Sequence, residues 1–126
     1  MIYRVIAGLI GALMALTAIS WIFDPATAAA DLGMPYLDGL GRSSQLGDFT
    51  AFFVFIAIAC GMGAITQKGH YLQGAGALLL LAAVFRTLAW AVYDAELATQ
   101  FIGFEVVAGA LLIFSASRIG YNEDVI

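Results

Sequence analysis

Hydrophobic residues fill four long stretches of the chain, and short polar connections separate these stretches. Each is about 20 residues long or longer, which is enough for a helix to cross the hydrocarbon core of a bilayer. The pattern predicts spanning helices at about 3–23, 45–66, 71–93 and 98–118. Short connections make consecutive helices antiparallel. We therefore predict an all-α protein, an integral membrane four-helix bundle of one domain (1–126) with up-down-up-down topology.

The longest connection follows the first stretch. Asp24 precedes Pro25, and a residue before proline is pushed out of the α-helical region, so the first helix should end there. Residues 26–32 predict a short interfacial helix that ends at Gly33. The rest of the connection, up to residue 44, is rich in turn-forming residues and predicts a loop. These residues are Gly39, Gly41, Ser43 and Ser44.

The composition supports a membrane protein and excludes several other classes. The chain is 63% hydrophobic and 11% charged, whereas soluble domains are about half apolar and a quarter charged. It has five Lys and Arg residues and a net charge of -4, so we expect no nucleic-acid partner. A single cysteine, Cys60, and a single histidine, His70, leave no internal disulfide and no bis-histidine haem site. We expect no metal and no cofactor held by this chain alone.

The distribution of basic residues predicts the orientation. Arg4, Lys68 and Arg118 fall on the side of the termini, and Arg42 is the one basic residue in the opposite connections. Those connections carry Asp24, Asp31, Asp38, Asp94 and Glu96. Cytoplasmic segments carry an excess of Lys and Arg. The sequence thus predicts a multi-pass protein of the bacterial inner membrane with both termini in the cytoplasm.

Three ionisable residues lie within the apolar stretches. At 1.5 Å per residue, Arg86 is roughly 12 Å from the outer end of the third helix and Glu105 roughly 10 Å from the outer start of the fourth. Asp48 is about 5 Å into the second helix by the same measure. A charge at such a depth is costly and marks function by default. The shared depth predicts one charged site in the outer third of the membrane.

The direction of these side chains favours contact between them. Side chains lean toward the N-terminus of their own helix, so Arg86 leans deeper and Glu105 leans outward. This opposes simple snorkelling of Arg86 to the outer surface. The two residues predict either a structural ion pair that pins neighbouring helices or a pocket for a polar head group. Trp90 and Tyr93 follow Arg86 on roughly the same face and would frame such a pocket.

Asp48 and the glycines of the predicted helices each have a structural interpretation and a functional one. Asp48 is either part of the pocket or an acid at a helix start, where free N–H groups and the helix dipole favour it. Glycines occur along all the predicted helices, and small residues let membrane helices approach closely. They serve bundle packing or, alternatively, a dimer seam. These glycines are Gly8, Gly11, Gly61, Gly63, Gly74, Gly76, Gly103 and Gly109.

Residues 47–53 (GDFTAFF), the later Arg86-x-x-Ala89-Trp90 and then Glu105 form a recognisable series. It resembles an uncharacterised family of small four-helix bacterial membrane proteins, broadly similar to DoxX-like proteins. The resemblance covers the second to fourth helices, about 75 residues by the spans above. It implies a four-helix membrane fold, groups Asp48 with Arg86 and Glu105, and brings no established reaction. DoxX-like proteins are loosely tied to quinone-linked electron transfer and membrane complexes.

The sequence leaves three functional hypotheses open. In the first, Arg86 holds the polar head of a lipid, quinone or isoprenoid, Glu105 and Asp48 orient Arg86 or accept a proton, and Trp90 and Tyr93 complete the site. In the second, the chain is a non-catalytic accessory subunit that stabilises a larger membrane complex, and a clean monomer or homo-oligomer would count against it. In the third, Glu105 transfers a proton to or from a lipophilic substrate. Membrane lipid is an expected partner in all three.

Overall fold

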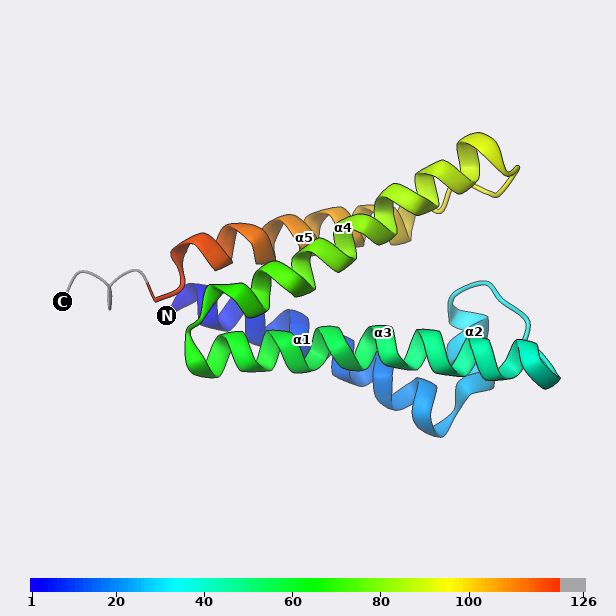
Figure 1. Cartoon of the computed structure of the whole chain (residues 1–126), viewed down its shortest axis with the longest axis horizontal. Helices are drawn as coiled ribbons and strands as arrows, with labels where there is room; N and C mark the ends of the chain where they lie inside the picture. The colour runs from blue at the N-terminus through cyan, green and yellow to red at the C-terminus, as the bar shows by residue number, and fades with distance from the viewer. Residues whose placement is uncertain (121–126) are drawn as a thin grey trace.

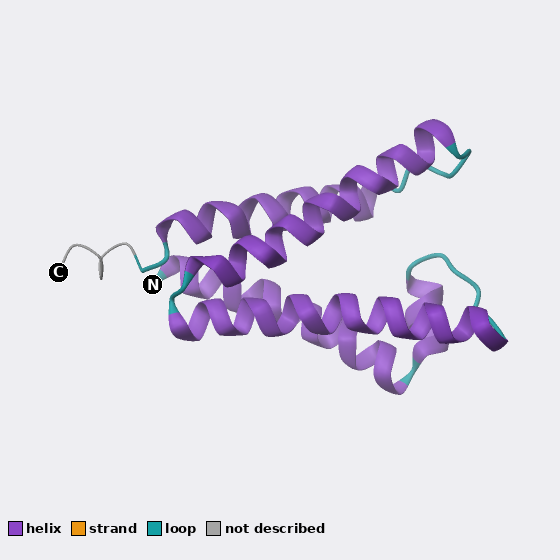
Figure 2. Cartoon of the chain, in the orientation of Figure 1, coloured by secondary structure: helices purple, strands orange, loops and turns teal. Residues whose placement is uncertain are grey.

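The computed structural model describes residues 1–120, and this part of the chain is helical without a strand (Figures 1 and 2). The four long helices are α1 (Ile2–Phe23), α3 (Gly39–Thr66), α4 (Gly69–Val92) and α5 (Thr99–Arg118). A short helix, α2 (Pro25–Asp31), follows α1. All four long helices are long and apolar enough to cross a membrane. The predicted fold class, an all-α four-helix membrane bundle, is confirmed.

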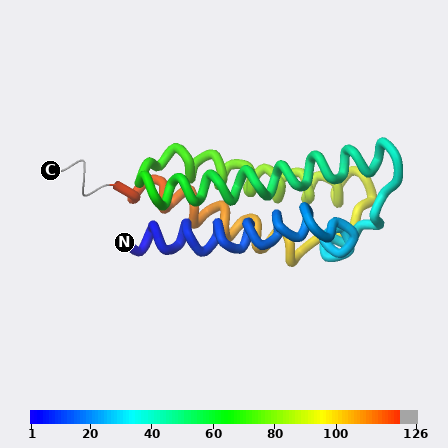
Figure 3. The backbone as a smooth tube through the Cα atoms, turned by 90° about the horizontal axis from the view of Figure 1, so that it is seen from below, coloured from blue at the N-terminus to red at the C-terminus, as the bar shows by residue number. Residues whose placement is uncertain are grey.

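The long helices alternate in direction (Figure 3). One end of the bundle, here called the terminal end, holds the start of α1, the α3–α4 turn and the end of α5. The opposite end, the loop end, holds α2, the segment between α2 and α3, and the α4–α5 connection. This is the predicted up-down-up-down order. The predicted short helix in the first connection is present as α2.

The prediction for residues 39–44 is wrong, because α3 begins at Gly39 rather than at residue 45. Gly39 has a positive φ of 56°, which costs a glycine little. Glycine and serine inside a helix cost at most about 1 kcal/mol each relative to alanine, and the segment has no proline to break the helix. Side-chain contacts from Arg42 and Gln45 to the preceding loop give these extra turns a tertiary partner. The other helix boundaries lie within two residues of those predicted.

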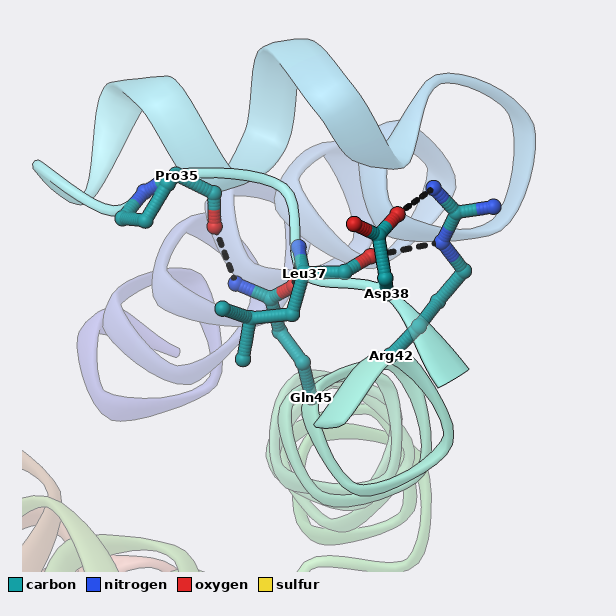
Figure 4. A network of polar contacts seen from close by, with 5 residues as sticks. All are labelled: Pro35, Leu37, Asp38, Arg42 and Gln45. Carbon is teal, nitrogen blue, oxygen red and sulfur yellow. Dashed lines mark hydrogen bonds and ion pairs between the residues drawn. The ribbon is translucent and has the colours of Figure 1, made fainter. Parts of the chain in front are cut away.

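The loop between α2 and α3 is attached to α3 through two side chains (Figure 4). The buried Gln45 donates a hydrogen bond from Nε2 to the Pro35 carbonyl oxygen and accepts one at Oε1 from the Leu37 N–H, both at 3.0 Å. Arg42 donates from Nε to the Leu37 carbonyl oxygen at 2.7 Å and forms an exposed ion pair with Asp38 at 3.4 Å. The loop is therefore held against the bundle by hydrogen bonds from two successive turns of α3.

The helices pack as two pairs, α1 with α3 and α4 with α5. Glycines lie where the paired helices approach most closely. A Cβ atom at Gly11 would lie 2.9 Å from the Cys60 side chain, and one at Gly76 would lie 2.9 Å from the Gly109 carbonyl oxygen. Gly11 and Gly76 therefore serve packing between the two helices of each pair, as one of the two interpretations of the glycines predicted. The largest buried side chains of the core are Trp21, Ile56, Leu72, Leu79 and Leu112.

The two pairs contact each other at the terminal end, where the Tyr3 ring of α1 packs edge-on against the Phe114 ring of α5 with the ring centres 5.9 Å apart. Each pair is also joined within itself at this end. Arg4 donates a hydrogen bond from Nε to the Ala64 carbonyl oxygen at 2.7 Å, near the end of α3, where a cation also complements the helix dipole. Gly69 lies directly against the Ala116 carbonyl group, so the start of α4 contacts the end of α5. Toward the loop end the α4–α5 pair diverges from the α1–α3 pair (Figure 1). The bundle is thus closed at one end and splayed at the other.

We predict that Gly76→Val destabilises the protein, because its side chain would overlap the Gly109 carbonyl oxygen and the Ile113 side chain. Overpacking of this kind costs about 1–3 kcal/mol. The midpoint of thermal unfolding of the purified protein in detergent should fall. Gly61→Val is the matched control, since a Cβ atom there meets nothing within 4 Å. Equal midpoints for the two variants would contradict the α4–α5 contact.

Candidate functional site

A cavity of about 270 Å³, here called the central cavity, lies between α1, α3, α4 and α5. Its wall is almost entirely apolar, and among residues 1–120 the charged residues that line it are Arg86 and Glu105. The remaining lining residues are Leu13, Met14, Thr17, Leu32, Phe52, Phe53, Leu79, Phe101 and Phe104. Such a cavity, with few polar groups in an apolar wall, is the usual form of a small-molecule site.

Arg86 and Glu105 form an ion pair on this wall. Arg86, on α4, donates a hydrogen bond from Nε to Oε1 of Glu105, on α5. The guanidinium also lies over the Phe101 ring, 4.9 Å from its centre. Phe101 and Glu105 are four residues apart and therefore share one face of α5. The pair confirms that Arg86 turns into the bundle, as the leaning of helical side chains predicted.

Each partner of the ion pair retains hydrogen-bonding capacity. The Glu105 side chain is 7% exposed, and its Oε2 atom is buried without a hydrogen-bond partner among residues 1–120. A buried acceptor left without a donor costs about 1–3 kcal/mol. The Arg86 side chain is 32% exposed, and the one hydrogen bond it makes within the described residues uses Nε. The terminal amino groups of the guanidinium therefore remain available to another acceptor.

A second cavity of about 420 Å³, here called the side cavity, lies between α3 and α4. It shares Phe52, Phe53 and Arg86 with the central cavity. Its other lining residues are Asp48, Phe49, Ala82, Phe85 and Ala89. Arg86 therefore lies on the boundary between the two cavities, with Glu105 on the wall of the central cavity and Asp48 on the wall of the side cavity.

Asp48 is placed near Arg86 without a direct bond. It is exposed and lines the side cavity, and the structure records no hydrogen bond or ion pair between it and Arg86 within residues 1–120. The alternative that Asp48 is a helix-start acid is wrong, because α3 begins nine residues earlier, at Gly39. The free N–H groups of a helix are confined to its first turn, so the cap explanation does not apply.

The two predicted aromatic residues lie outside both cavities. Trp90 is 50% exposed and Tyr93 is 75% exposed, and neither lines the central or the side cavity. That Trp90 and Tyr93 frame the site therefore stays a prediction. Both residues follow Arg86 along α4 and its C-terminal cap, toward the loop end, where the helix pairs diverge (Figure 1). The spacing along α4 placed Trp90 and Tyr93 near Arg86, but it could not show that the bundle leaves both side chains largely exposed.

Phenylalanines form the aromatic part of the wall instead. Phe52 and Phe53 come from α3, and Phe101 and Phe104 come from α5. None of these four phenylalanines was predicted as a site residue. The spacing of four residues between Phe101 and Glu105 was the one available signal. Leu13, Met14 and Thr17 of α1 carry no comparable signal, because only the fold brings them to the cavity.

Residues 1–120 contain no group of three or more His, Cys, Asp or Glu side chains arranged to hold a metal ion. Comparison with protein-family models, with curated proteins and with solved structures produced no match in any of the three. The resemblance to DoxX-like proteins therefore remains a prediction. The chemistry of the site has to be inferred from its own residues.

We predict that Arg86→Met destabilises the protein by about 3 kcal/mol, because it leaves the buried Glu105 carboxylate unpaired. The double variant Arg86→Met/Glu105→Leu should recover most of this loss, since two apolar side chains replace the whole pair. Unfolding of purified protein in detergent, followed by circular dichroism, provides the measurement. Lys68→Met is the control, because this side chain is exposed in the turn between α3 and α4 and lines neither cavity, and a surface substitution of this kind changes stability by about 0.5 kcal/mol or less. A double variant no more stable than Arg86→Met would contradict a direct pairing.

Proposed function

We propose that this multi-pass membrane protein binds a lipophilic small molecule, a lipid, quinone or isoprenoid, with its polar head at Arg86 and Glu105. The observation that carries the proposal is the ion pair on the wall of an otherwise apolar cavity. A charged pair inside a membrane span is costly unless it is fully satisfied. This one retains an unpaired carboxylate oxygen and free guanidinium donors.

The shape of the site suits a molecule with a polar head and an apolar tail. The central cavity accommodates the head beside Arg86, and the side cavity continues past Phe52 and Phe53 along α3 and α4. These two helices pack less extensively than the pairs α1–α3 and α4–α5. A tail can therefore extend from Arg86 between α3 and α4 toward the surrounding lipid. Trp90 and Tyr93, both exposed near the loop end, would lie outside the bundle at the membrane interface.

We further propose that the terminal end faces the cytoplasm and the loop end faces the outer side of a bacterial inner membrane. Arg4, Lys68 and Arg118 support this orientation, because basic residues are enriched in cytoplasmic segments. The site then lies nearer the outer leaflet. The likeness of residues 47–53, Arg86 and Glu105 to DoxX-like sequences is consistent with a protein of a bacterial membrane.

The proposal predicts that Arg86→Met removes a specifically bound molecule while the purified protein stays folded. Loss of a charge-assisted hydrogen bond worth about 1.5–3 kcal/mol lowers the affinity roughly tenfold or more, so less of the molecule should remain bound through purification. Organic extracts of protein purified in a mild detergent are analysed by mass spectrometry for lipids, quinones and isoprenoids. The double variant Arg86→Met/Glu105→Leu repeats the test in a more stable background, and Lys68→Met is the control. Unchanged bound molecules in both Arg86 variants would refute the proposal.

A second candidate function, an accessory subunit of a membrane complex or a homo-oligomer, is favoured by a different observation. Gly8 of α1 and Gly103 of α5 are exposed, and a Cβ atom at either would meet nothing within 4 Å. Bundle packing does not explain these two glycines. Small residues on an outer face allow another membrane helix to approach closely.

If the accessory function holds, a gentle detergent pull-down of the tagged chain from its native membrane should recover a stable partner or a second copy. Gly8→Val and Gly103→Val should abolish that recovery, because each adds a branched side chain to the outer face. Their folding should be unaffected, since neither position contacts the rest of the bundle. Gly61→Val, which is on α3, is the matched control. A chain recovered as a clean monomer would count against this second function.

A further inference from the structure

We propose that the head group recognised at Arg86 and Glu105 is an uncharged hydroxyl, as in a prenyl alcohol or a phenolic lipophile, and not an anionic phosphate or carboxylate. This inference rests on the proposed function and narrows its ligand class. It comes from the balance of charges around the two cavities and from the hydrogen-bonding groups that their walls leave unused.

The charge balance opposes an anion. Within the described part of the chain, Arg86 is the one cation that lines either cavity, and it is already neutralised by its ion pair with Glu105. Asp48, on the wall of the side cavity, adds a further negative charge. An anionic head would have to separate Arg86 from Glu105 or lie beside two carboxylates. Like charges repel strongly where water is scarce, and a buried carboxylate deprived of its partner is costly.

The unused hydrogen-bonding groups match a hydroxyl. A hydroxyl group donates one hydrogen bond and accepts others. It can donate to Glu105, whose buried Oε2 has no donor among the described residues, and accept from a terminal amino group of Arg86. Thr17, the other hydroxyl on the wall, does not fill this role, because its Oγ1 donates to the Leu13 carbonyl oxygen at 3.1 Å. Since Oε2 is covered by its neighbours, the ligand hydroxyl reaches it only after a lining side chain has shifted.

The first arm of the test compares two probes that share one tail, farnesol and farnesyl monophosphate. The full chain is reconstituted in nanodiscs of phosphatidylcholine, which has no net charge, and equilibrium binding of each radiolabelled probe is measured. We expect farnesol to bind at least tenfold more tightly, with binding lost in Arg86→Met/Glu105→Leu. Tighter binding of the phosphate that still requires Arg86 would overturn this inference and leave the proposed function intact. If neither probe binds in a way that depends on Arg86, this inference is overturned, and the extraction experiment on the Arg86 variants decides the proposed function separately.

The second arm uses Glu105→Gln, which keeps the side-chain volume but leaves Arg86 without a counter-charge. We expect the preference to shift at least tenfold toward farnesyl monophosphate. Asp48→Asn, at an exposed position that should tolerate the change, is expected to shift it in the same direction by a smaller factor. Asp38→Asn is the control, because this aspartate lies in the loop before α3 with its side chain 99% exposed, and it should leave the preference unchanged. A Glu105→Gln variant that retains the preference for farnesol overturns the inference; if this variant does not fold, the wild-type comparison and Asp48→Asn decide it.

Discussion

The central constraint on this protein is that a charged side chain within an apolar span needs an internal partner. Arg86 is far enough from either end of α4 that its guanidinium has to be satisfied by protein. Glu105 on α5 supplies the partner, and the resulting ion pair connects two helices that also pack closely through Gly76 and Gly109. The position of the pair, on a cavity wall and not in the packed core, is what makes the site a candidate for binding. A purely structural pair would use all of its hydrogen-bonding atoms, whereas this one leaves Oε2 of Glu105 without a donor.

The bundle divides into a packed part and an open part, and glycine placement explains the difference. At the terminal end, Arg4 bonds to the end of α3, and Gly63 of α3 lies against the Leu72 side chain of α4. At the loop end, the helix pairs separate (Figure 1) and the walls are lined by phenylalanine and leucine. Where the helix pairs diverge, large side chains leave space between the helices, whereas small residues would have let the helices approach closely. The two cavities are therefore a consequence of how the helices cross.

The loop before α3 contributes to the site indirectly. Gln45 and Arg42 hold this loop by hydrogen bonds to the Pro35 and Leu37 carbonyl oxygens. Leu32, which lies just before it, forms part of the central cavity wall. Extension of α3 back to Gly39 is what places Gln45 and Arg42 within reach of the loop. A segment that resembles a flexible connection in sequence is thus part of the frame that encloses the cavity.

The sequence by itself determined the number of spanning helices, their alternating direction and the identity of the two paired charges. These properties follow from the length of apolar runs, from short connections and from the cost of an unpaired charge in lipid, all of which act locally or depend on depth alone. Only the tertiary structure decided which residues enclose the site. Trp90, one turn from Arg86, lies outside it, while Phe52, Phe101 and Leu13 come to it from other helices. The physical reason is that depth along a helix can be counted from the sequence, whereas the rotation and crossing of the helices depend on contacts between residues far apart in the chain.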